Sequence, residues 1–469
     1  MPQTKMDMAK VLAILSQPKE ALPPLENVQR IRMEVPYITK AGKVEARWIR
    51  AILPGGAVQP MPLIYVPHYE MGEDAVELRD YLSHGWAVAC PDSFDNSYNG
   101  MLTDDDLVFN NAALHALRKR PEFDLNKIIL VGGSAGGYMT LMLNGLQLGL
   151  CASIANGPVT NVYFNFHFYW NRTNVMNMQA LARLAAENTA DEHANADSKD
   201  PLKVMQRLSS LPVPFMAGLA GMFAPIRDNF PNAEDFSRWE SLSPVGLADC
   251  FCSPFMVNHC TSDVLVPVDQ ISKRFTYDQP GESLPEGFLH RLPESFPGKL
   301  GKSLEECLPE STTRTACIHV PEKAPDVDLP YDADKRFNLN IFDDGPVEGY
   351  GSHSSRVDVG RRLDCKYLQE MFSRTARNTC VLTPGMLKSL LLRWQGKSVA
   401  LPAHIGVNDT VYGSLAVYRQ EILGELSLWE KNHGEGALNS VMEILLPHES
   451  DIAELKKAYS EIRQMLKNV

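Results

Sequence analysis

The spacing of hydrophobic residues changes along the chain. Between residues 29 and 52, apolar positions alternate with polar ones on both sides of the turn signal Lys40-Ala-Gly-Lys43, so the sequence predicts a β-hairpin. Beyond residue 60, short apolar runs alternate with segments of helical spacing, which is typical of a mostly parallel sheet with helices on both faces. The predicted strands are 60–66, 86–90, 127–131, 151–155, 254–257 and 337–342, and the predicted helices between them are 73–83, 104–120 and 135–148.

Two stretches interrupt this alternation. Residues 158–245 have helical patterns but no clear strand, so we expect a helical cap over the sheet, and residues 271–335 are rich in Pro, Gly and charge. After about residue 356 the pattern is helical throughout. The expected organisation is an N-terminal helix and linker (1–28), an α/β core (29–157 and 246–356) with an irregular insertion (271–335), the cap (158–245), and a C-terminal helical extension (357–469) with helices at 357–374, 385–394, 410–430 and 436–466.

Composition narrows the class of protein. With 44% hydrophobic and 22% charged residues the chain is globular, and its net charge of −12 disfavours a nucleic-acid partner. The nine cysteines include no Cys-x-x-Cys pair, which argues against structural zinc and fits a reducing compartment. No apolar leader and no run of roughly 18 apolar residues is visible. We therefore expect a cytoplasmic protein with no membrane span; the oligomeric state stays open.

Ser134 is the candidate nucleophile. It lies in Gly132-Gly-Ser-Ala-Gly136, directly after an apolar strand and before a helix. This strand–turn–helix setting is that of a nucleophile elbow, in which the flanking residues must be very small. The helix N-terminus then directs backbone N–H groups at a developing oxyanion.

A serine at its normal pKa is a poor nucleophile, so a base and an orienting acid must be present. In folds with a nucleophile elbow, the three residues occur along the chain in the order Ser, acid, His. Asp263 follows the strand at 254–257 and is the expected acid, with Asp269 as its rival. His353 follows the strand at 337–342 and is the expected base. Of the other histidines, His259 is too near the acid strand and His290 lies in the irregular insertion.

These motifs resemble the α/β-hydrolase superfamily, most closely the catalytic domain of the prolyl oligopeptidase family. The matching segments are 81–92, 132–138, 243–244 and 263–267, and the resemblance extends over 29–155 and 240–356. Only about 28 residues precede the first strand, so the β-propeller common in that family is absent from this sequence. The resemblance implies a serine hydrolase that needs neither a metal nor an organic cofactor.

The same resemblance implies an oxyanion hole. The Ala135 N–H would be the first donor. Where family members often carry His-Gly-Gly, this chain has Val66-Pro-His-Tyr-Glu-Met-Gly72. The second donor would therefore come from the backbone near His68 or Tyr69, or from the Tyr69 hydroxyl.

An aromatic run opens the expected cap. Seven of the eight residues from Tyr163 to Trp170 are aromatic or histidine, more than one helix face can bury. Some are expected to pack in the core and others to line a substrate pocket. The substrate-binding candidates are Tyr163, Phe166, His167 and Trp170. The acidic run Asp104-Asp-Asp106 is expected to be a charge cluster at a helix N-terminus.

The sequence as a whole predicts a serine hydrolase that cleaves a small carboxylic ester or amide with an apolar part through an acyl-enzyme. An ester is favoured because the propeller is absent and the cap is apolar. Two alternatives stay open. One is a small peptidase or acyl-peptide hydrolase, and the other is a non-catalytic binding protein on a hydrolase scaffold.

Overall fold

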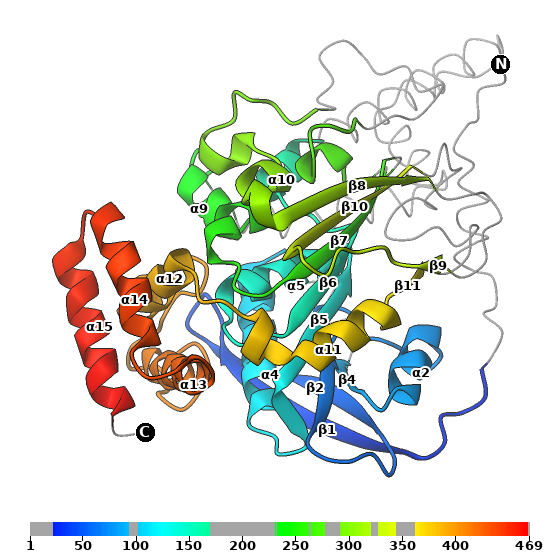
Figure 1. The fold of residues 1–469 in the computed structure, drawn as a ribbon. Helices are drawn as coiled ribbons and strands as arrows, with labels where there is room; N and C mark the ends of the chain where they lie inside the picture. Colours follow the sequence, from blue (N-terminus) through cyan, green and yellow to red (C-terminus); the bar gives the residue numbers. More distant parts are fainter. Residues whose placement is uncertain are drawn as a thin grey trace, which may run out of the picture.

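The computed structural model describes residues 22–92, 102–168, 230, 232–261, 263, 265–276, 291–319, 327–343 and 362–467 (Figure 1). The expected N-terminal helix, Trp170 and His353 lie outside these residues.

A single large sheet organises the described residues, with its strands in the order β1-β2-β4-β3-β5-β6-β7-β10-β8. β1 and β2 pair antiparallel, as do β2 and β4, and every other neighbour is parallel. This is the α/β-hydrolase fold, as the sequence predicted. The strands are β1 (Val28–Ile38), β2 (Val44–Pro54), β3 (Met61–Tyr65), β4 (Ala87–Pro91), β5 (Phe123–Gly133), β6 (Ala152–Asn156), β7 (Phe255–Cys260), β8 (Thr313–His319) and β10 (Phe337–Asp343), and a separate pair is β9 (Val327–Asp328) with β11 (Arg362–Leu363).

Helices cover both faces of this sheet. α4 (Asp104–Arg118) and α5 (Ala135–Leu146) pack on one face, while α2 (Val76–Ser83) and α11 (Cys365–Thr379) pack on the other. Successive residues of β5 explain the two layers, because side chains alternate across a strand. Ile128 and Leu130 are buried with α4 and α5, whereas Ile129 and Val131 are buried with α2 and α11. Each fully buried aliphatic side chain contributes about 1.5–3 kcal/mol.

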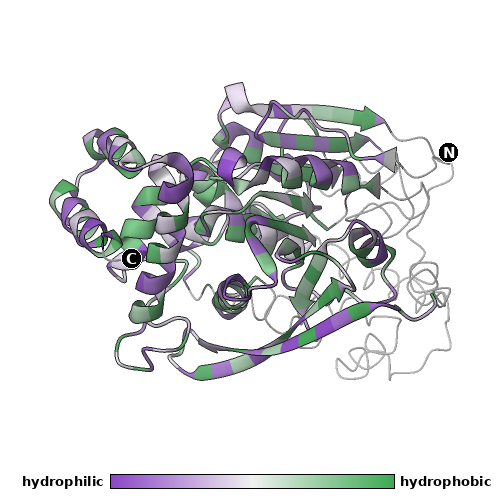
Figure 2. Ribbon diagram, turned by 60° about the horizontal axis from the view of Figure 1, so that its bottom comes forward, coloured by the Kyte–Doolittle hydropathy of each residue, from purple (hydrophilic) through white to green (hydrophobic). Residues whose placement is uncertain are grey.

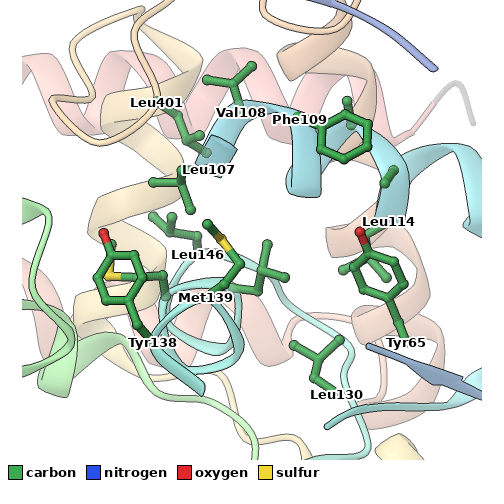
Figure 3. Packing of buried hydrophobic residues seen from close by; sticks show 14 of the residues in the cluster. Tyr65, Leu107, Val108, Phe109, Leu114, Leu130, Tyr138, Met139, Leu146 and Leu401 are labelled. Carbon is green, nitrogen blue, oxygen red and sulfur yellow. The ribbon is translucent and has the colours of Figure 1, made fainter. Parts of the chain in front are cut away.

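The layer between the sheet and α4 is densely aromatic and aliphatic. Tyr65 and Leu130 from the sheet meet Leu114 of α4, and Met139 and Leu146 of α5 lie beside Leu107 (Figure 3). The long β1–β2 ribbon has a different pattern. Hydrophilic and hydrophobic residues alternate along its strands (Figure 2), as expected for a strand pair with one face exposed to solvent.

The C-terminal helices form a group beside one end of the sheet (Figure 1). They are α12 (Pro384–Trp394), α13 (Leu415–His433), α14 (Ala437–Leu445) and α15 (Ile452–Leu466). The prediction of one helix over 436–466 is wrong. Pro447 lies between α14 and α15 and lacks the N–H that a continuous helix needs. The prediction of a helix from 410 is also too early, because Ser414 caps α13 by accepting a hydrogen bond from the Val417 N–H.

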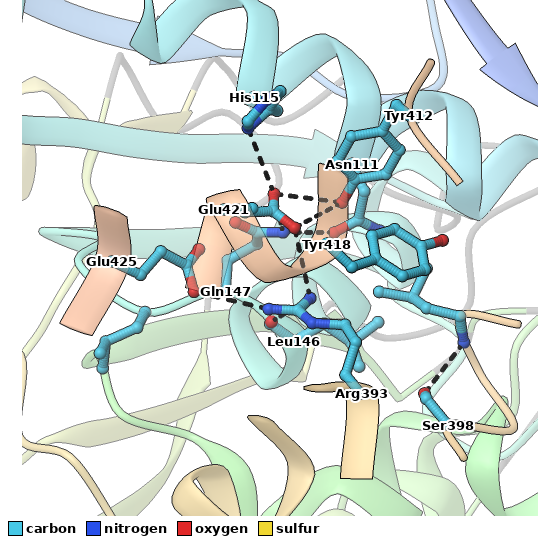
Figure 4. A network of polar contacts seen from close by, with 12 residues as sticks. Asn111, His115, Leu146, Gln147, Arg393, Ser398, Tyr412, Tyr418, Glu421 and Glu425 are labelled. Carbon is cyan, nitrogen blue, oxygen red and sulfur yellow. Dashed lines mark hydrogen bonds and ion pairs between the residues drawn. The ribbon is translucent and has the colours of Figure 1, made fainter. Parts of the chain in front are cut away.

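A buried polar junction attaches this group to the core (Figure 4). Arg393 of α12 lies 3.7 Å from Glu421 and 3.5 Å from Glu425, both on α13. Arg118 of α4 donates to Glu425 over 2.6 Å. We call these four residues the junction cluster. Two cations and two carboxylates share one buried site, so each charge is partly compensated. Burial nevertheless raises the pKa of Glu425 to about 7.

The insertion at 271–335 is more regular than expected. It contributes the edge strand β8, which pairs parallel with β10. Every side chain of β8 is at least partly exposed, so its sequence TRTACIH lacks the apolar run of a central strand. The remaining short helices are α9 (Phe236–Ser241), α10 (Leu304–Cys307), η2 (Pro244–Cys250), η3 (Val268–Gln270), η4 (Gly298–Gly301), η5 (Glu310–Thr312) and η7 (Leu446–His448).

Candidate active site

Ser134 stands on a strained turn between β5 and α5. Its backbone has φ 55° and ψ −122°, a conformation that costs a non-glycine residue roughly 1–3 kcal/mol. The turn is held because the Ser134 N–H donates to the Asn156 carbonyl of β6 over 2.8 Å. The side chain is partly exposed at the carboxyl end of the sheet. This is the backbone geometry of a nucleophile elbow.

The glycines around Ser134 are required by close packing. A Cβ on Gly132 would lie 2.3 Å from the Gly136 carbonyl oxygen. A Cβ on Gly136 would lie 3.1 Å from the Pro67 carbonyl oxygen, and one on Gly137 would lie 3.1 Å from the Asn156 carbonyl oxygen. The elbow is thus pressed against β6 and against the loop that follows β3.

Ala135 is the first residue of α5 and is buried. An N–H in the first turn of a helix has no acceptor within its own helix. The helix dipole adds a partial positive charge at this point. The Ala135 N–H therefore suits the stabilisation of negative charge that develops on an oxygen beside Ser134.

The loop after β3 brings Tyr69 to the elbow. The nearest Tyr69 ring atom lies 3.3 Å from the position that a Cβ on Gly136 would occupy. The backbone N–H groups of this loop have internal acceptors. The His68 N–H donates to Asn110 Oδ1 over 3.0 Å, and the Tyr69 N–H donates to the Pro67 carbonyl over 2.9 Å. The two backbone N–H groups expected as second oxyanion donors thus already have acceptors within the protein.

A buried clamp holds this loop. His68 has φ 72° and is 1% exposed, and its Nδ1 lies 2.6 Å from Asp106 Oδ2. Asn110 accepts from the Tyr65 hydroxyl over 2.8 Å as well as from the His68 N–H. Arg47 lies 3.3 Å from Asp106 Oδ1. The side chain of His68, predicted only as part of the oxyanion loop, thus anchors the loop to α4.

The acidic run at the start of α4 is more than a charge cluster. The Asp104 carboxylate accepts from Arg238 of α9 over 2.6 Å, and Asp105 accepts from the Lys40 N–H of the β1–β2 turn over 2.6 Å. With Asp106 on His68, each aspartate holds a different segment. These roles were not predicted, although three adjacent carboxylates on a helix otherwise rich in apolar residues were a visible signal.

Asp263 lies beyond the carboxyl end of β7, two strands from the elbow strand β5. It is fully buried, and its Oδ1 accepts from the N–H groups of Leu265 (2.8 Å) and Val266 (3.0 Å). Its Oδ2 lies 3.8 Å from His259 Nε2, which itself bonds the Val266 carbonyl over 2.8 Å. Two backbone donors on one oxygen fix the plane of the Asp263 carboxylate.

The rival Asp269 is also buried, in η3. The expected base, His353, lies outside the described residues. The strand before it, β10, ends at Asp343 at the same edge of the sheet.

The aromatic run after β6 separates into two groups. Phe164 and Phe168 are fully buried, whereas Tyr163, Phe166 and His167 are partly exposed. The Tyr163 ring makes edge contacts with further aromatic rings. These are His167 (4.5 Å between centroids), Phe296 (4.8 Å), Trp239 (5.3 Å) and Phe236 (5.7 Å). Burial lowers the pKa of His167 and favours its neutral form.

The rings around Tyr163 form an aromatic wall. Three of its members were not predicted from the sequence: Phe236, Trp239 and Phe296. They lie 70 or more residues beyond Tyr163, and only the fold brings them to it. In the part of the chain that the structure describes, no group of three or more metal-ligating side chains occurs, and no helix is both long and apolar enough to cross a membrane.

No family model matches the chain, and no curated protein matches its sequence. Its structure is similar to that of acylaminoacyl peptidase from Pyrococcus horikoshii, at 14% identity and a TM-score of 0.39, over 76% of this chain and 42% of that one. It is also similar to oligopeptidase B from Leishmania major (12%, TM-score 0.35, 74% and 36%) and to a puromycin hydrolase (13%, TM-score 0.31, 51% and 32%). The chain therefore spans less than half the length of each of these proteins, and the likeness concerns the fold alone.

Proposed function

We propose that this chain is a serine hydrolase in which Ser134 attacks the carbonyl carbon of an ester or amide. The observation that carries the proposal is the backbone of Ser134, held at a positive φ directly before α5. Strain of this kind persists only where the surroundings enforce it, and glycine contacts on both sides of the residue do so. A serine needed only to cap the helix would have extended backbone and a side-chain bond to the first turn, and Ser134 has neither.

The proposed reaction has two steps. In the first, His353 takes the Ser134 Oγ proton while Oγ bonds the carbonyl carbon, and then gives that proton to the leaving alcohol or amine. In the second, His353 takes a proton from water, the hydroxide oxygen bonds the acyl carbon, and Oγ leaves and regains its proton. Asp263 holds the imidazole and stabilises its cation. The two backbone bonds on Asp263 Oδ1 support this role, because they fix the orientation of the carboxylate at the carboxyl end of the sheet.

Two donors are proposed for the oxyanion. The Ala135 N–H is the first, at the start of α5. The Tyr69 hydroxyl is the second, since the backbone N–H groups of His68 and Tyr69 already donate within the loop. Tyr69 stands in the segment where the resembling family often carries His-Gly-Gly. The bond between His68 and Asp106 would hold this segment in place, so that the Tyr69 hydroxyl is fixed at the site.

The proposed substrate has an apolar part that lies against Tyr163, Phe166 and His167. Their partial exposure beside the buried rings of Phe164, Phe168 and Trp239 supports this assignment. The preference for a carboxylic ester over an amide stays a prediction, and a small peptide or acyl-peptide is the alternative substrate class. Trp170 is proposed as a further wall residue from its sequence position alone.

An active-site-directed fluorophosphonate tests the proposal, because only an activated serine reacts with it rapidly. We expect the wild-type chain and Ser83→Ala to be labelled and Ser134→Ala not to be. Ser83 is exposed at the end of α2 and bonds only Asp80 and His84 beside it, so it is the matched control. A labelled Ser134→Ala protein, or an unlabelled but folded wild-type chain, would contradict the proposed function. A screen of p-nitrophenyl esters beside aminoacyl p-nitroanilides then separates ester from amide substrates.

A further inference from the structure

Three asparagines lie directly opposite one another across the sheet. Asn156 of β6 is in register with Asn258 of β7, which is in register with Asn340 of β10. Their side chains bond in sequence: Asn340 Nδ2 donates to Asn258 Oδ1 over 2.9 Å, and Asn258 Nδ2 donates to Asn156 Oδ1 over 2.9 Å. Arg314 of β8 donates to Asn340 Oδ1 over 2.8 Å. We call this row of four side chains the amide ladder.

The direction of the ladder is fixed by its far end. Arg314 can only donate, so the Asn340 oxygen must face it and the Asn340 amide nitrogen must face Asn258. The Pro330 carbonyl, 2.8 Å from Asn340 Nδ2, requires the same orientation. Asn258 must then accept from Asn340 and donate to Asn156. Asn156 is left as an acceptor toward the ladder, with its own Nδ2 hydrogens directed elsewhere.

Asn156 is the end of the ladder that adjoins the elbow. It is the last residue of β6, it pairs in register with Gly133, and its carbonyl accepts the Ser134 N–H. Asn258 and Asn340 are buried, whereas Asn156 is partly exposed. Among the described residues its Nδ2 makes no hydrogen bond. A chain of amides that begins at a guanidinium is polarised in one direction, which strengthens the last donor.

We infer that Asn156 Nδ2 is a substrate-binding donor, and that the ligand group it takes is a second hydrogen-bond acceptor, a carbonyl or carboxylate oxygen, near the scissile carbonyl. The inference rests on the proposed function, because it concerns the substrate of the Ser134 site. It narrows the substrate class to acyl groups that carry such an oxygen, for example N-acylated amino acids. Asn258, Asn340 and Arg314 are positioning residues that fix which face of the Asn156 amide the substrate meets.

A matched pair of esters isolates this contact. The p-nitrophenyl esters of N-acetylglycine and of pentanoic acid have acyl chains of equal length, but only the first has a second carbonyl. The measured quantity is the ratio of their kcat/KM values. Asn156→Asp keeps an oxygen facing Asn258 and replaces the donor by an acceptor. It also adds a negative charge, whose effect on the attacked carbonyl is common to both esters and cancels in the ratio. We expect it to lower the ratio roughly 10-fold, the loss of one good hydrogen bond.

A second variant reverses the direction of the hydrogen bond between Asn258 and Asn156 without substituting Asn156. In Asn258→Asp the ladder can be satisfied only if the Asn156 amide turns over, so that Oδ1 replaces Nδ2 at the site. We expect the same direction of change, several-fold in size. Asn338→Asp is the control, because Asn338 is buried on β10, two positions before Asn340, but bonds only the backbone of residues 332 and 335. It should lower the melting temperature and leave the ratio unchanged.

The outcomes separate the two ideas. If the wild-type chain is not labelled by fluorophosphonate and hydrolyses neither ester, the proposed function fails and this inference falls with it. If the chain is active but Asn156→Asp leaves the ratio unchanged, or lowers both esters equally, the inference alone is overturned. A changed ratio in Asn338→Asp would also overturn it, since a buried carboxylate anywhere in this face would then suffice.

Discussion

The sheet edge around Ser134 and the junction cluster are both polar and largely buried, but their groups are arranged differently. In the junction cluster, Arg393 and Arg118 face Glu421 and Glu425, all on regular helices. At the sheet edge the backbone of Ser134 and of His68 is held at positive φ, and the Ala135 N–H has no acceptor in its helix.

This difference indicates what each cluster is for. A polar group that serves stability is matched by partners inside the protein, because an unmatched buried group costs free energy. A group that serves binding or catalysis must instead keep capacity for something outside the protein, and strain near it is tolerated for that reason. Substitutions at the edge should therefore change rates at constant stability, and substitutions in the junction cluster should do the reverse.

The largest expected effect is that of Ser134→Ala. Loss of the nucleophile should lower kcat by roughly 10⁴–10⁶ while the melting temperature stays within about 2 °C of wild type, since alanine keeps the Cβ that the turn already accommodates. Steady-state hydrolysis of a p-nitrophenyl ester and thermal unfolding are the two measurements. A folded Ser134→Ala protein that keeps most of its activity would contradict the assignment of Ser134 as the nucleophile.

Asp263→Asn should follow, with a loss in kcat of about 10⁴ because an amide favours the wrong tautomer of the base. Asp269→Asn is the matched variant, as both aspartates are buried within six positions of each other. Harmless Asp263→Asn beside damaging Asp269→Asn would reassign the acid.

Tyr69→Phe removes only a hydroxyl at the edge. If this hydroxyl is the second oxyanion donor, kcat should fall by roughly 10²–10³. KM and the melting temperature should change little, because the ring contact with Gly136 is kept. A raised KM at unchanged kcat would mean that the hydroxyl binds substrate and transition state equally.

Arg393→Met tests the other side of the comparison. It leaves two buried carboxylates with Arg118 alone, and removing one partner of a buried ion pair costs about 3–5 kcal/mol. Denaturant unfolding should show this loss, while kcat/KM of the folded fraction stays at the wild-type value. The double variant Arg393→Met, Glu421→Gln keeps the neutral pair of Arg118 and Glu425 and should recover part of the stability. Reduced kcat/KM in the folded Arg393→Met protein would show that the two clusters are coupled.

The smallest effect concerns pH. Burial raises the pKa of Asp364, which accepts from the Tyr81 hydroxyl over 2.6 Å, to about 6. Because this value is above the unfolded value of about 3.9, the stability that Asp364 contributes is complete below pH 4 and is lost as pH rises through 6. Asp364→Asn stays neutral, so its stability relative to wild type should rise by about 1–2 kcal/mol between pH 4 and pH 7. Parallel pH profiles for the two proteins would contradict the assignment.

The sequence predicted the central strands and the elbow because their signals are local. A buried parallel strand is a continuous apolar run, and the elbow is five adjacent residues. β8 was missed because an edge strand is half exposed and its sequence mixes threonine, arginine and cysteine. The break between α14 and α15 could have been predicted from Pro447.

The contacts that complete the site are not local, and this is why the sequence did not reveal them. The His68–Asp106 bond joins residues 38 positions apart, and the amide ladder joins asparagines on three separate strands. An isolated asparagine in an apolar run carries no indication of its partner. Only the register of the sheet shows that three of them stand in one row.

The first turn of α4 also has a consequence for synthesis of the chain. Asp104 and its partner Arg238 are 134 positions apart, and Asp104 is 1% exposed in the finished fold. At translation rates of about 5–20 residues per second, the arginine leaves the ribosome roughly 7–27 s after the aspartate. Over that interval the start of α4 has its nearer partners, among them Lys40 3.4 Å from Asp104, but not the cation from α9. The nascent chain therefore passes through a stage of several seconds in which this end of the helix still lacks the α9 cation and is open to water.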